Sequence, residues 1–357
     1  MPEWIKITLW IILIPVGLII LYLAVVIIWG MVTLYSPPPV ETMDVPKPCD
    51  DTLYQGDSLT LITWNVGYGG LGKEMDFFYE GGEKVRPDKE LYDRYVKGIT
   101  DRLKTLGEAD LFLFQEVDQR AKRSYYDNQV KWILGSLPGF FVFFAPNYRV
   151  RFVPLPFLHP MGDVHSGLVT LSRLCPRTAL RYAFPPDESW PTRLFMLHRC
   201  FLVTEMTVNG KSFTLINTHH SAFDETGEAK LIQLEMLREV AMEAFQKGSY
   251  VIAGGDWNQN PPDFNQELIS SGDAVKTIDP LIPDTIMPAG WKWIYDPSQP
   301  TNRDVNKPYT KGETRTTLID FFLVSPNVEV LEIKTIPVNF AFTDHQPVSM
   351  KVNLVGQ

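Results

Sequence analysis

Six short runs of this chain carry carboxylate, amide or imidazole side chains beside apolar segments. The runs are TWNVG (63–67), FQEVD (114–118), INTHH (216–220), GGDWN (254–258), LIDFF (318–322) and TDHQP (343–347). The β-branched and aromatic residues next to them are typical of buried strands. Catalytic groups tend to lie on loops that a rigid scaffold positions. We therefore expect these polar side chains to meet at one rim of a β-sheet core.

The elements that must position these side chains follow from the hydrophobic pattern. We expect strands over 59–65, 111–115, 140–144, 167–172, 200–208, 212–217, 250–254, 317–324 and 348–352. We expect helices over 88–106, 124–137 and 225–246, the last of which repeats its apolar residues at helical spacing. Nine or more strands with few helices predict two sheets packed face to face, with the helices outside.

In this order, the six runs resemble the endonuclease/exonuclease/phosphatase superfamily. That family includes pancreatic-type deoxyribonuclease, apurinic endonucleases, inositol polyphosphate 5-phosphatases and neutral sphingomyelinases. The resemblance covers roughly residues 59–354. It implies an α/β fold, a four-layered sandwich of two mainly antiparallel sheets with outer helices. It also implies hydrolysis of a phosphomonoester or phosphodiester.

The resemblance implies a divalent cation beside Glu116. Asn65 would be its partner through the side-chain carbonyl, and Asp344 would lie near the metal and its waters. Oxygen ligands without thiolates suit Mg²⁺, or Mn²⁺, better than Zn²⁺. Such a cation polarises the phosphoryl oxygen.

The remaining catalytic roles are also carried over by motif. His345 and Asp320 would act as base and orienting carboxylate, because a carboxylate beside an imidazole fixes its tautomer and raises its pKa. Asp256 matches the water-activating aspartate, so either Asp256 or His345 is the base. Asn258 would donate its amide to a phosphate oxygen.

His219 matches the second histidine of the family, but His220 is its neighbour. Successive strand residues point to opposite faces, so one of the two should face the site. We expect that to be His219, with Asn217 supporting it from the same face.

His165 and Arg173 are further substrate-binding candidates, because HSGL…LSR (165–173) resembles a glycine-containing family strand ending in Ser-Arg. Many family members have asparagine where His165-Ser166 stands. Two insertions, 69–96 and 147–163, are expected to shape the substrate pocket.

Residues 7–35 contain no charged side chain. A run of that length predicts a membrane span, since about 20 apolar residues cross a bilayer. Lys6 precedes the run, and no Lys or Arg follows before Lys47. The positive-inside rule then places the N-terminus in the cytoplasm and the catalytic domain on the outer side. We expect a single-pass anchor at 1–35, a proline-rich linker at 36–58 and the catalytic domain at 59–357.

The net charge of −9 does not call for a nucleic-acid partner. The chain has three cysteines, Cys49, Cys175 and Cys200, without zinc-binding spacing. We expect free buried thiols, or a Cys175–Cys200 bridge if their strands are neighbours.

The favoured function is a membrane-anchored phosphoesterase acting on a phospholipid or a lipid-linked head group. Its partners would be the lipid bilayer and the phosphoester, with no obligate protein partner inferred. A membrane-tethered nuclease is the alternative, although the one dense basic segment is 119–131. A non-catalytic scaffold is disfavoured because the motif residues are all present.

Overall fold

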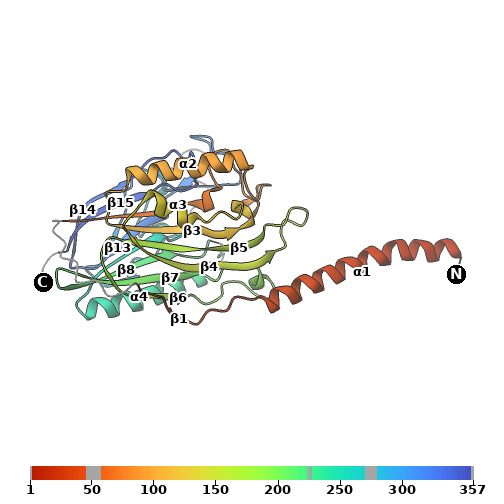
Figure 1. Ribbon diagram of the computed structural model, residues 1–357, viewed down its shortest axis with the longest axis horizontal. Coiled ribbons are helices and arrows are strands. Elements are labelled where there is room, and N and C mark those ends of the chain that lie inside the picture. Colours follow the sequence, from red (N-terminus) through yellow and green to blue (C-terminus); the bar gives the residue numbers. More distant parts are fainter. Residues whose placement is uncertain (1, 46–57, 223, 225–226, 270–279, 355–357) are drawn as a thin grey trace.

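Two β-sheets packed face to face form the centre of the protein in the computed structural model (Figure 1). The structure describes residues 2–45, 58–222, 224, 227–269 and 280–354. One sheet has the order β1-β6-β7-β8-β9-β13-β10, and the other β14-β15-β2-β3-β5-β4. The strands of the first are Val40–Thr42, Pro176–Ala183, Cys200–Val208, Lys211–His219, Tyr250–Asp256, Asp320–Val324 and Lys292–Ile294. Those of the second are Val328–Thr335, Val348–Leu354, Leu59–Asn65, Leu111–Ala121, Gly162–Ser172 and Phe141–Val153.

The hydrophobic core lies between the sheets and under the helices. Leu61 and Leu113 of one sheet pack with Leu215, Ile252 and Phe322 of the other. Helices α2 (Lys89–Thr105) and α3 (Gln129–Ser136) cover the outer face of the six-stranded sheet, and α4 (Glu228–Gln246) covers that of the seven-stranded sheet. The expected four-layered α/β sandwich is confirmed.

Local sequence explains where the helices begin. Asp88 caps α2 by accepting a hydrogen bond from Leu91 N at 2.8 Å. Helix α3 begins at Gln129, later than expected, because Tyr125 and Tyr126 adopt left-handed backbone angles. The chain enters a helix only after this turn, where Asn128 accepts from Lys131 N.

The expected insertion at 147–163 is mostly strand. Strand β4 continues to Val153 and β5 begins at Gly162, so the two form a long hairpin joined by residues 154–161. This hairpin projects toward the end of the molecule that carries α1 (Figure 1). Strands β6 and β14 were not expected from the sequence.

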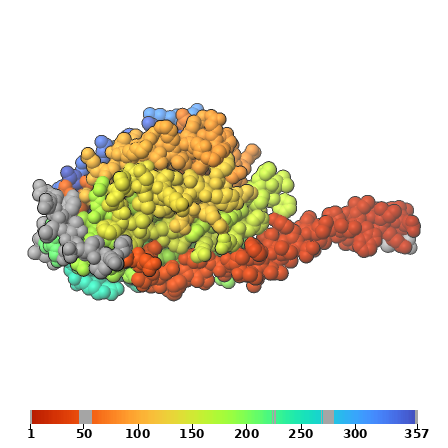
Figure 2. Space-filling model, in the orientation of Figure 1, coloured from red at the N-terminus to blue at the C-terminus, as the bar shows by residue number. Residues whose placement is uncertain are grey.

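Helix α1 (Glu3–Val32) extends from the domain and is long and apolar enough to cross a membrane. Its last turns pack on the domain: Val26 and Gly30 are buried, and a Cβ on Gly30 would lie 2.9 Å from the Phe195 ring. The segment expected as a linker is partly strand, because β1 pairs antiparallel with β6. Figure 2 shows the segment after α1, in red to orange, lying along the domain surface.

Candidate catalytic site

Three polar residues of the site, His219, Asp256 and Asp320, lie in register on adjacent strands of the seven-stranded sheet. Strands β8 and β9 are parallel and place His219 opposite Asp256. Strand β13 is antiparallel to β9 and places Asp320 on the other side of Asp256. Because the three residues are neighbours across adjacent strands, their side chains begin close together.

Strands β2 and β3 of the other sheet add Asn65 and Glu116. These strands are parallel and pair Asn65 with Gln115. A bulge follows, with a register shift between Phe114 and Val117, and Glu116 has a φ of 56°. Bulges re-aim side chains beside active sites, and here Glu116 lines the cleft. Asn65 Nδ2 donates to Asp256 Oδ2 at 2.9 Å and to Glu116 Oε1 at 3.3 Å, which connects the two sheets.

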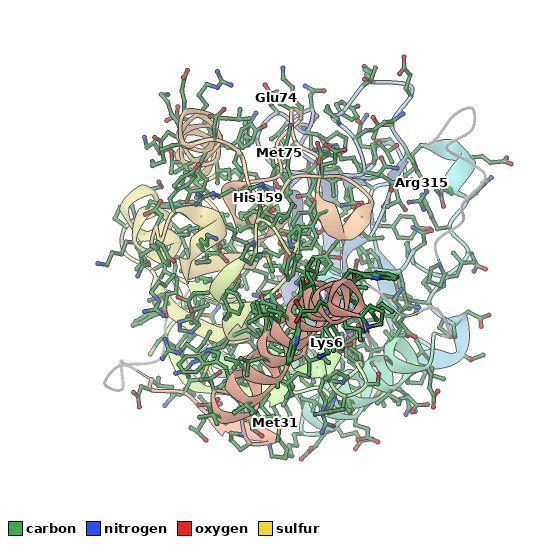
Figure 3. All side chains as sticks on the ribbon, turned by 90° about the vertical axis from the view of Figure 1, so that its right-hand side faces the viewer. Lys6, Met31, Glu74, Met75, His159 and Arg315 are labelled. Atoms are coloured by element: carbon green, nitrogen blue, oxygen red, sulfur yellow. The ribbon has the colours of Figure 1, made fainter. Side chains whose placement is uncertain are left out.

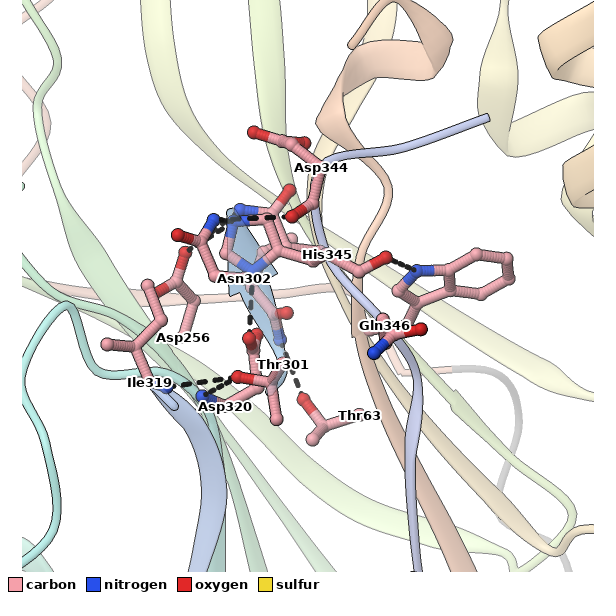
Figure 4. A network of polar contacts seen from close by, with 12 residues as sticks. Thr63, Asp256, Thr301, Asn302, Ile319, Asp320, Asp344, His345 and Gln346 are labelled. Atoms are coloured by element: carbon pink, nitrogen blue, oxygen red, sulfur yellow. Dashed lines mark hydrogen bonds and ion pairs between the residues drawn. The ribbon is translucent and has the colours of Figure 1, made fainter. Parts of the chain in front are cut away.

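His345 lies at the centre of the polar network in Figure 4, on the loop before β15. Its Nδ1 is 2.8 Å from Asp320 Oδ2, and its Nε2 is 3.6 Å from Asp256 Oδ2. Asn302 Nδ2 lies 2.9 Å from the same Nε2. Thr301 Oγ1 accepts from the backbone N of Asp320 at 3.0 Å and so holds the carboxylate in place. The structure thus brings together the expected imidazole and its orienting carboxylate.

The titration of these groups follows from their surroundings. Burial alone would lower the pKa of His345, but the carboxylates of Asp320 and Asp256 outweigh it and raise this pKa well above its usual range. Burial raises the pKa of Asp256 to about 6, although His345 opposes the shift. The carboxylates therefore favour the protonated form of His345, and burial favours the protonated form of Asp256.

His219, rather than His220, faces the cleft. His219 Nε2 is 3.5 Å from Asp256 Oδ2, and burial together with Arg199 lowers the pKa of His219 well below its usual range. The His220 ring packs edge-on against Phe184 and Trp257 instead. Alternation along β8 separates the two rings, as expected.

Glu116 and Asp344 fit a hard divalent cation. Both line the cleft, and burial raises the pKa of Asp344 to about 6, with Glu116 acting in the same direction. A cation between two such carboxylates offsets their repulsion. Gly67 makes room for Asp344, since a Cβ there would lie 2.5 Å from Asp344 Oδ1. Asn65 differs from expectation: its Oδ1 accepts from Gly67 N at 2.9 Å, so its amide nitrogen, not its carbonyl, faces the carboxylates.

Asp256, Asp320 and His345 also lie close enough to hold a metal, with one ligand atom of each within 4.8 Å of the others. The 2.8 Å contact between His345 Nδ1 and Asp320 Oδ2 is a hydrogen bond, so these two side chains already pair with each other.

Two other residues predicted from the sequence, Asn258 and Asn217, lie at the cleft or directly below it. Asn258 lines the cleft, and its Nδ2 donates to the His220 carbonyl at 2.9 Å. Asn217 does not contact His219. It accepts from Gln115 Nε2 at 2.8 Å and donates to Val169 O at 3.0 Å, so it joins the two sheets below the site.

The structure does not bring His165 or Arg173 into the cleft. His165 borders a separate hollow with Arg120 and Arg149, while its neighbour Ser166 lines the cleft. Arg173 donates to the carbonyls of Gly107 and Ala109. Strand β5 is antiparallel to β3, so its Ser-Arg end lies beside the start of β3, away from Glu116.

The cleft has a volume of about 130 Å³ and includes side chains that the sequence analysis missed. Arg199 is 7 % exposed, and its Nη1 has no hydrogen-bond partner among the described residues. Glu80, from the 69–96 insertion, also lines the cleft, and burial raises its pKa to about 7. Asn302 completes the contact with His345. None of these residues ends an apolar strand in a recognisable motif, so no sequence signal marked them.

The family model of the endonuclease/exonuclease/phosphatase family matches residues 62–345, which include every candidate catalytic and metal-binding residue above. The chain belongs to this family. Its members are hydrolases that act on phosphoester bonds. No match is found among curated protein sequences.

Solved structures share the fold at low sequence identity. An endonuclease/exonuclease/phosphatase from Beutenbergia cavernae is 18% identical, with a TM-score of 0.55 over 84% of this chain and 72% of that one. ANGEL2, a 2′,3′-cyclic phosphatase in complex with adenosine-2′,3′-vanadate, is 15% identical, with a TM-score of 0.55 over 89% and 99%. TDP2 from D. rerio, complexed with a single-strand DNA product, is 15% identical, with a TM-score of 0.52 over 84% and 100%. At these identities the likeness establishes the fold alone.

Proposed function

We propose that the protein is a membrane-anchored, divalent-metal-dependent phosphoesterase that cleaves the head group of a phospholipid or a lipid-linked phosphoester. The observation that carries this proposal is the position of the cleft relative to α1. Leu34, Tyr35 and Ser36, just after α1, line a cavity of about 530 Å³. That cavity shares Leu197 and Arg199 with the catalytic cleft. An enzyme of this shape meets substrates at the surface of its own membrane.

The cleft residues suit phosphoester hydrolysis. Glu116 and Asp344 would hold Mg²⁺ or Mn²⁺, which as a Lewis acid polarises the phosphoryl oxygen. Asp256 Oδ2 orients and deprotonates the attacking water, which bonds to phosphorus as the ester P–O bond breaks, and the leaving oxygen takes a proton from solvent. His345, kept protonated by Asp320, stabilises negative charge on the phosphoryl oxygens. Such positioned proton transfer is worth about 10²–10⁴-fold in rate.

Two further side chains would bind the phosphate. Arg199 offers its unpartnered guanidinium nitrogen beside His219, and a fixed cation in a buried site stabilises developing negative charge. Asn258 would turn its amide toward the same group.

Cysteine chemistry supports placing the domain outside the cytoplasm. Cys175 is disulfide-bonded, whereas Cys200 is a free buried thiol. The expected alternative of a Cys175–Cys200 bridge is therefore wrong, and the expectation of free buried thiols is confirmed for Cys200 but wrong for Cys175. Cys49 lies outside the described residues. Disulfides persist mainly in oxidising compartments, which agrees with the orientation inferred from the few charges flanking α1.

The nuclease alternative draws less support from the surface. Two arginines of the basic segment 119–131 are already paired: Arg123 binds Asp118 in a bidentate contact, and Arg120 binds Asp163 at 2.7 Å. A protein that follows a nucleic-acid backbone needs cations free to contact phosphates.

A substrate panel tests the proposal. Full-length protein in detergent or vesicles is assayed with Mg²⁺ against phosphomonoesters, phosphodiesters, phospholipids and DNA, with Asp256→Asn as the inactive control. We expect turnover of a phospholipid or lipid-linked phosphoester that Asp256→Asn abolishes. Ready cleavage of DNA with no product from any lipid would replace this function with the nuclease.

A further inference from the structure

We infer that residues 154–160, together with Trp190, enter the bilayer beside α1, and that the apolar pocket behind this loop holds an acyl chain of the substrate. This deepens the proposed function and rests on it for the identity of the ligand. We call residues 154–160 the membrane loop. The pocket behind it is the tail pocket, lined by Tyr79, Val153, Pro154, Leu155, Glu188, Pro191, Thr192, Phe195 and Met196.

The membrane loop presents apolar side chains to the outside. Leu155, Phe157 and Leu158 are 51 %, 63 % and 81 % exposed, and Trp190 is 55 % exposed. Soluble surfaces seldom group large apolar residues in this way, and such patches mark membrane or protein contacts. Figure 3 looks onto the end of the molecule that carries α1 and shows His159 of the loop on the same face as Lys6 and Met31 of the helix.

A contact between aromatic rings of the membrane loop and α1 indicates how deeply the loop enters the bilayer. The Phe157 ring packs edge-on against Tyr22 of α1, with centroids 5.5 Å apart. Counted from Ile7, the first residue after Lys6, about 20 residues cross the hydrocarbon core and end near Val26. Tyr22 then lies about 6 Å inside the outer boundary of that core, at 1.5 Å per residue. This depth matches that of side chains in interfacial segments, which enter the bilayer by about 5–10 Å.

The loop is held in a defined shape. Met161 N donates to Leu155 O at 2.8 Å and closes the loop, and Lys122 Nζ donates to Pro160 O at 2.8 Å. At its base, Arg149 lies over the Tyr35 ring at 5.1 Å. A cation beside apolar side chains suits the boundary between lipid phosphates and acyl chains.

The tail pocket connects this surface with the chemistry. It has a volume of about 340 Å³, and most of its lining is apolar. Tyr79 and Met196 line both the tail pocket and the catalytic cleft. These two side chains are in contact, with Tyr79 Oη 3.8 Å from Met196 Sδ, and stand between the two pockets. A lipid whose phosphate lies in the cleft can therefore place one chain past them in the adjacent tail pocket, toward the membrane loop. A soluble sugar phosphate has no apolar chain to place in such a pocket.

Site-specific labelling tests insertion without relying on activity. Leu158→Cys in the full chain is labelled with an environment-sensitive fluorophore and placed in phosphatidylcholine/phosphatidylglycerol nanodiscs. The matched control is Leu331→Cys, an exposed leucine (47 %) on β14, which lies at the end of the domain away from α1 (Figure 1). We expect blue-shifted emission, and quenching by spin-labelled lipid, for position 158 alone. Equal, water-like emission at both positions would overturn the membrane loop.

A chain-length series tests the tail pocket. For short-chain phospholipids below their micelle concentrations, each methylene should raise kcat/KM about four-fold until the pocket is full. Thr192→Trp, which fills the pocket from an exposed position, should flatten this dependence. Thr105→Trp, at an exposed position on α2, should keep it.

The outcomes separate the two levels of the proposal. A wild-type slope in Thr192→Trp would refute the tail pocket while leaving lipid hydrolysis intact. Absence of turnover on every phospholipid and lipid-linked phosphoester would refute the proposed function and the pocket ligand together. The labelling result would still decide whether the loop enters the bilayer.

Discussion

Replacing His220 by phenylalanine should make the protein more resistant to acid. The ring is fully buried, and neither of its nitrogens has a hydrogen-bond partner among the described residues. It packs edge-on against Phe184 and Trp257, with centroids 5.4 and 5.0 Å away. Burial, with smaller effects from Arg199 and Lys230, lowers the pKa of His220 from 6.5 to about 3. Folding therefore disfavours the protonated ring.

The size of the effect follows from this shift. Between about pH 6.5 and pH 3 the unfolded chain binds one more proton at this residue than the folded protein does, so stability falls as the pH falls through that window. At about 1.4 kcal/mol per unit, the whole shift corresponds to about 5 kcal/mol. Phenylalanine fills a similar volume in an aromatic cluster, so above pH 7 the variant should differ from wild type by less than about 1.5 kcal/mol.

Urea unfolding of the full chain in detergent, followed by tryptophan fluorescence from pH 4.5 to 7.5, measures both quantities. The free energy of unfolding of His220→Phe should exceed that of wild type by an amount that grows by about 1.4 kcal/mol per unit as the pH falls below 6. Leu331→Phe, at an exposed position on β14 without a titratable group, serves as the control. Parallel pH curves for wild type and His220→Phe would show that the buried ring carries no protonation penalty.

Three more predictions concern the site and the cysteines. His345→Ala and Asp320→Asn should each lower kcat about 10²–10⁴-fold. The double variant should be little worse than the poorer single variant, because the effects of groups that act as a unit are non-additive. Multiplicative losses would show that the two residues act separately. Chelator should abolish activity and Mg²⁺ should restore it, because Glu116 and Asp344 are left as adjacent carboxylates; full turnover in metal-free buffer would contradict the cation site. Alkylation of the denatured, non-reduced protein should label Cys200 but not Cys175, as mass spectrometry of the peptides would show.

The sequence predicts the scaffold well because apolar periodicity reports strand interiors. Strands β2 and β7 have the predicted bounds, and α2 and α4 differ from prediction only at their ends. Strand β14 was missed because its sequence, VEVLEIKT, carries a charge at every second or third position and its exposed face resembles a loop.

The site was predicted where a motif ends a strand and missed where side chains arrive from loops. His219 and Asp256 follow directly from parallel strand ends. Glu116 faces the cleft because of a bulge at which its φ is positive, and no local sequence pattern predicts that bulge. Arg199 precedes β7, and Asn302 lies in the short strand β11 (Asn302–Arg303), so their convergence on the cleft depends on tertiary packing alone.

The pairing of β1 with the sheet limits how far the catalytic domain can move from the membrane. Seven residues separate Val32, the last of α1, from Val40, where the chain is already hydrogen-bonded to β6. If α1 spans a bilayer whose core ends near Val26, the helix up to Val32 adds about 9 Å and the extended residues add about 25 Å. The domain then cannot lift away from that bilayer by more than about 34 Å without breaking β1 from the sheet. The enzyme then encounters its lipid substrate by diffusion within the plane of the membrane. The rate should follow the mole fraction of substrate in the enzyme's own membrane, and diluting the whole sample with buffer should leave it unchanged.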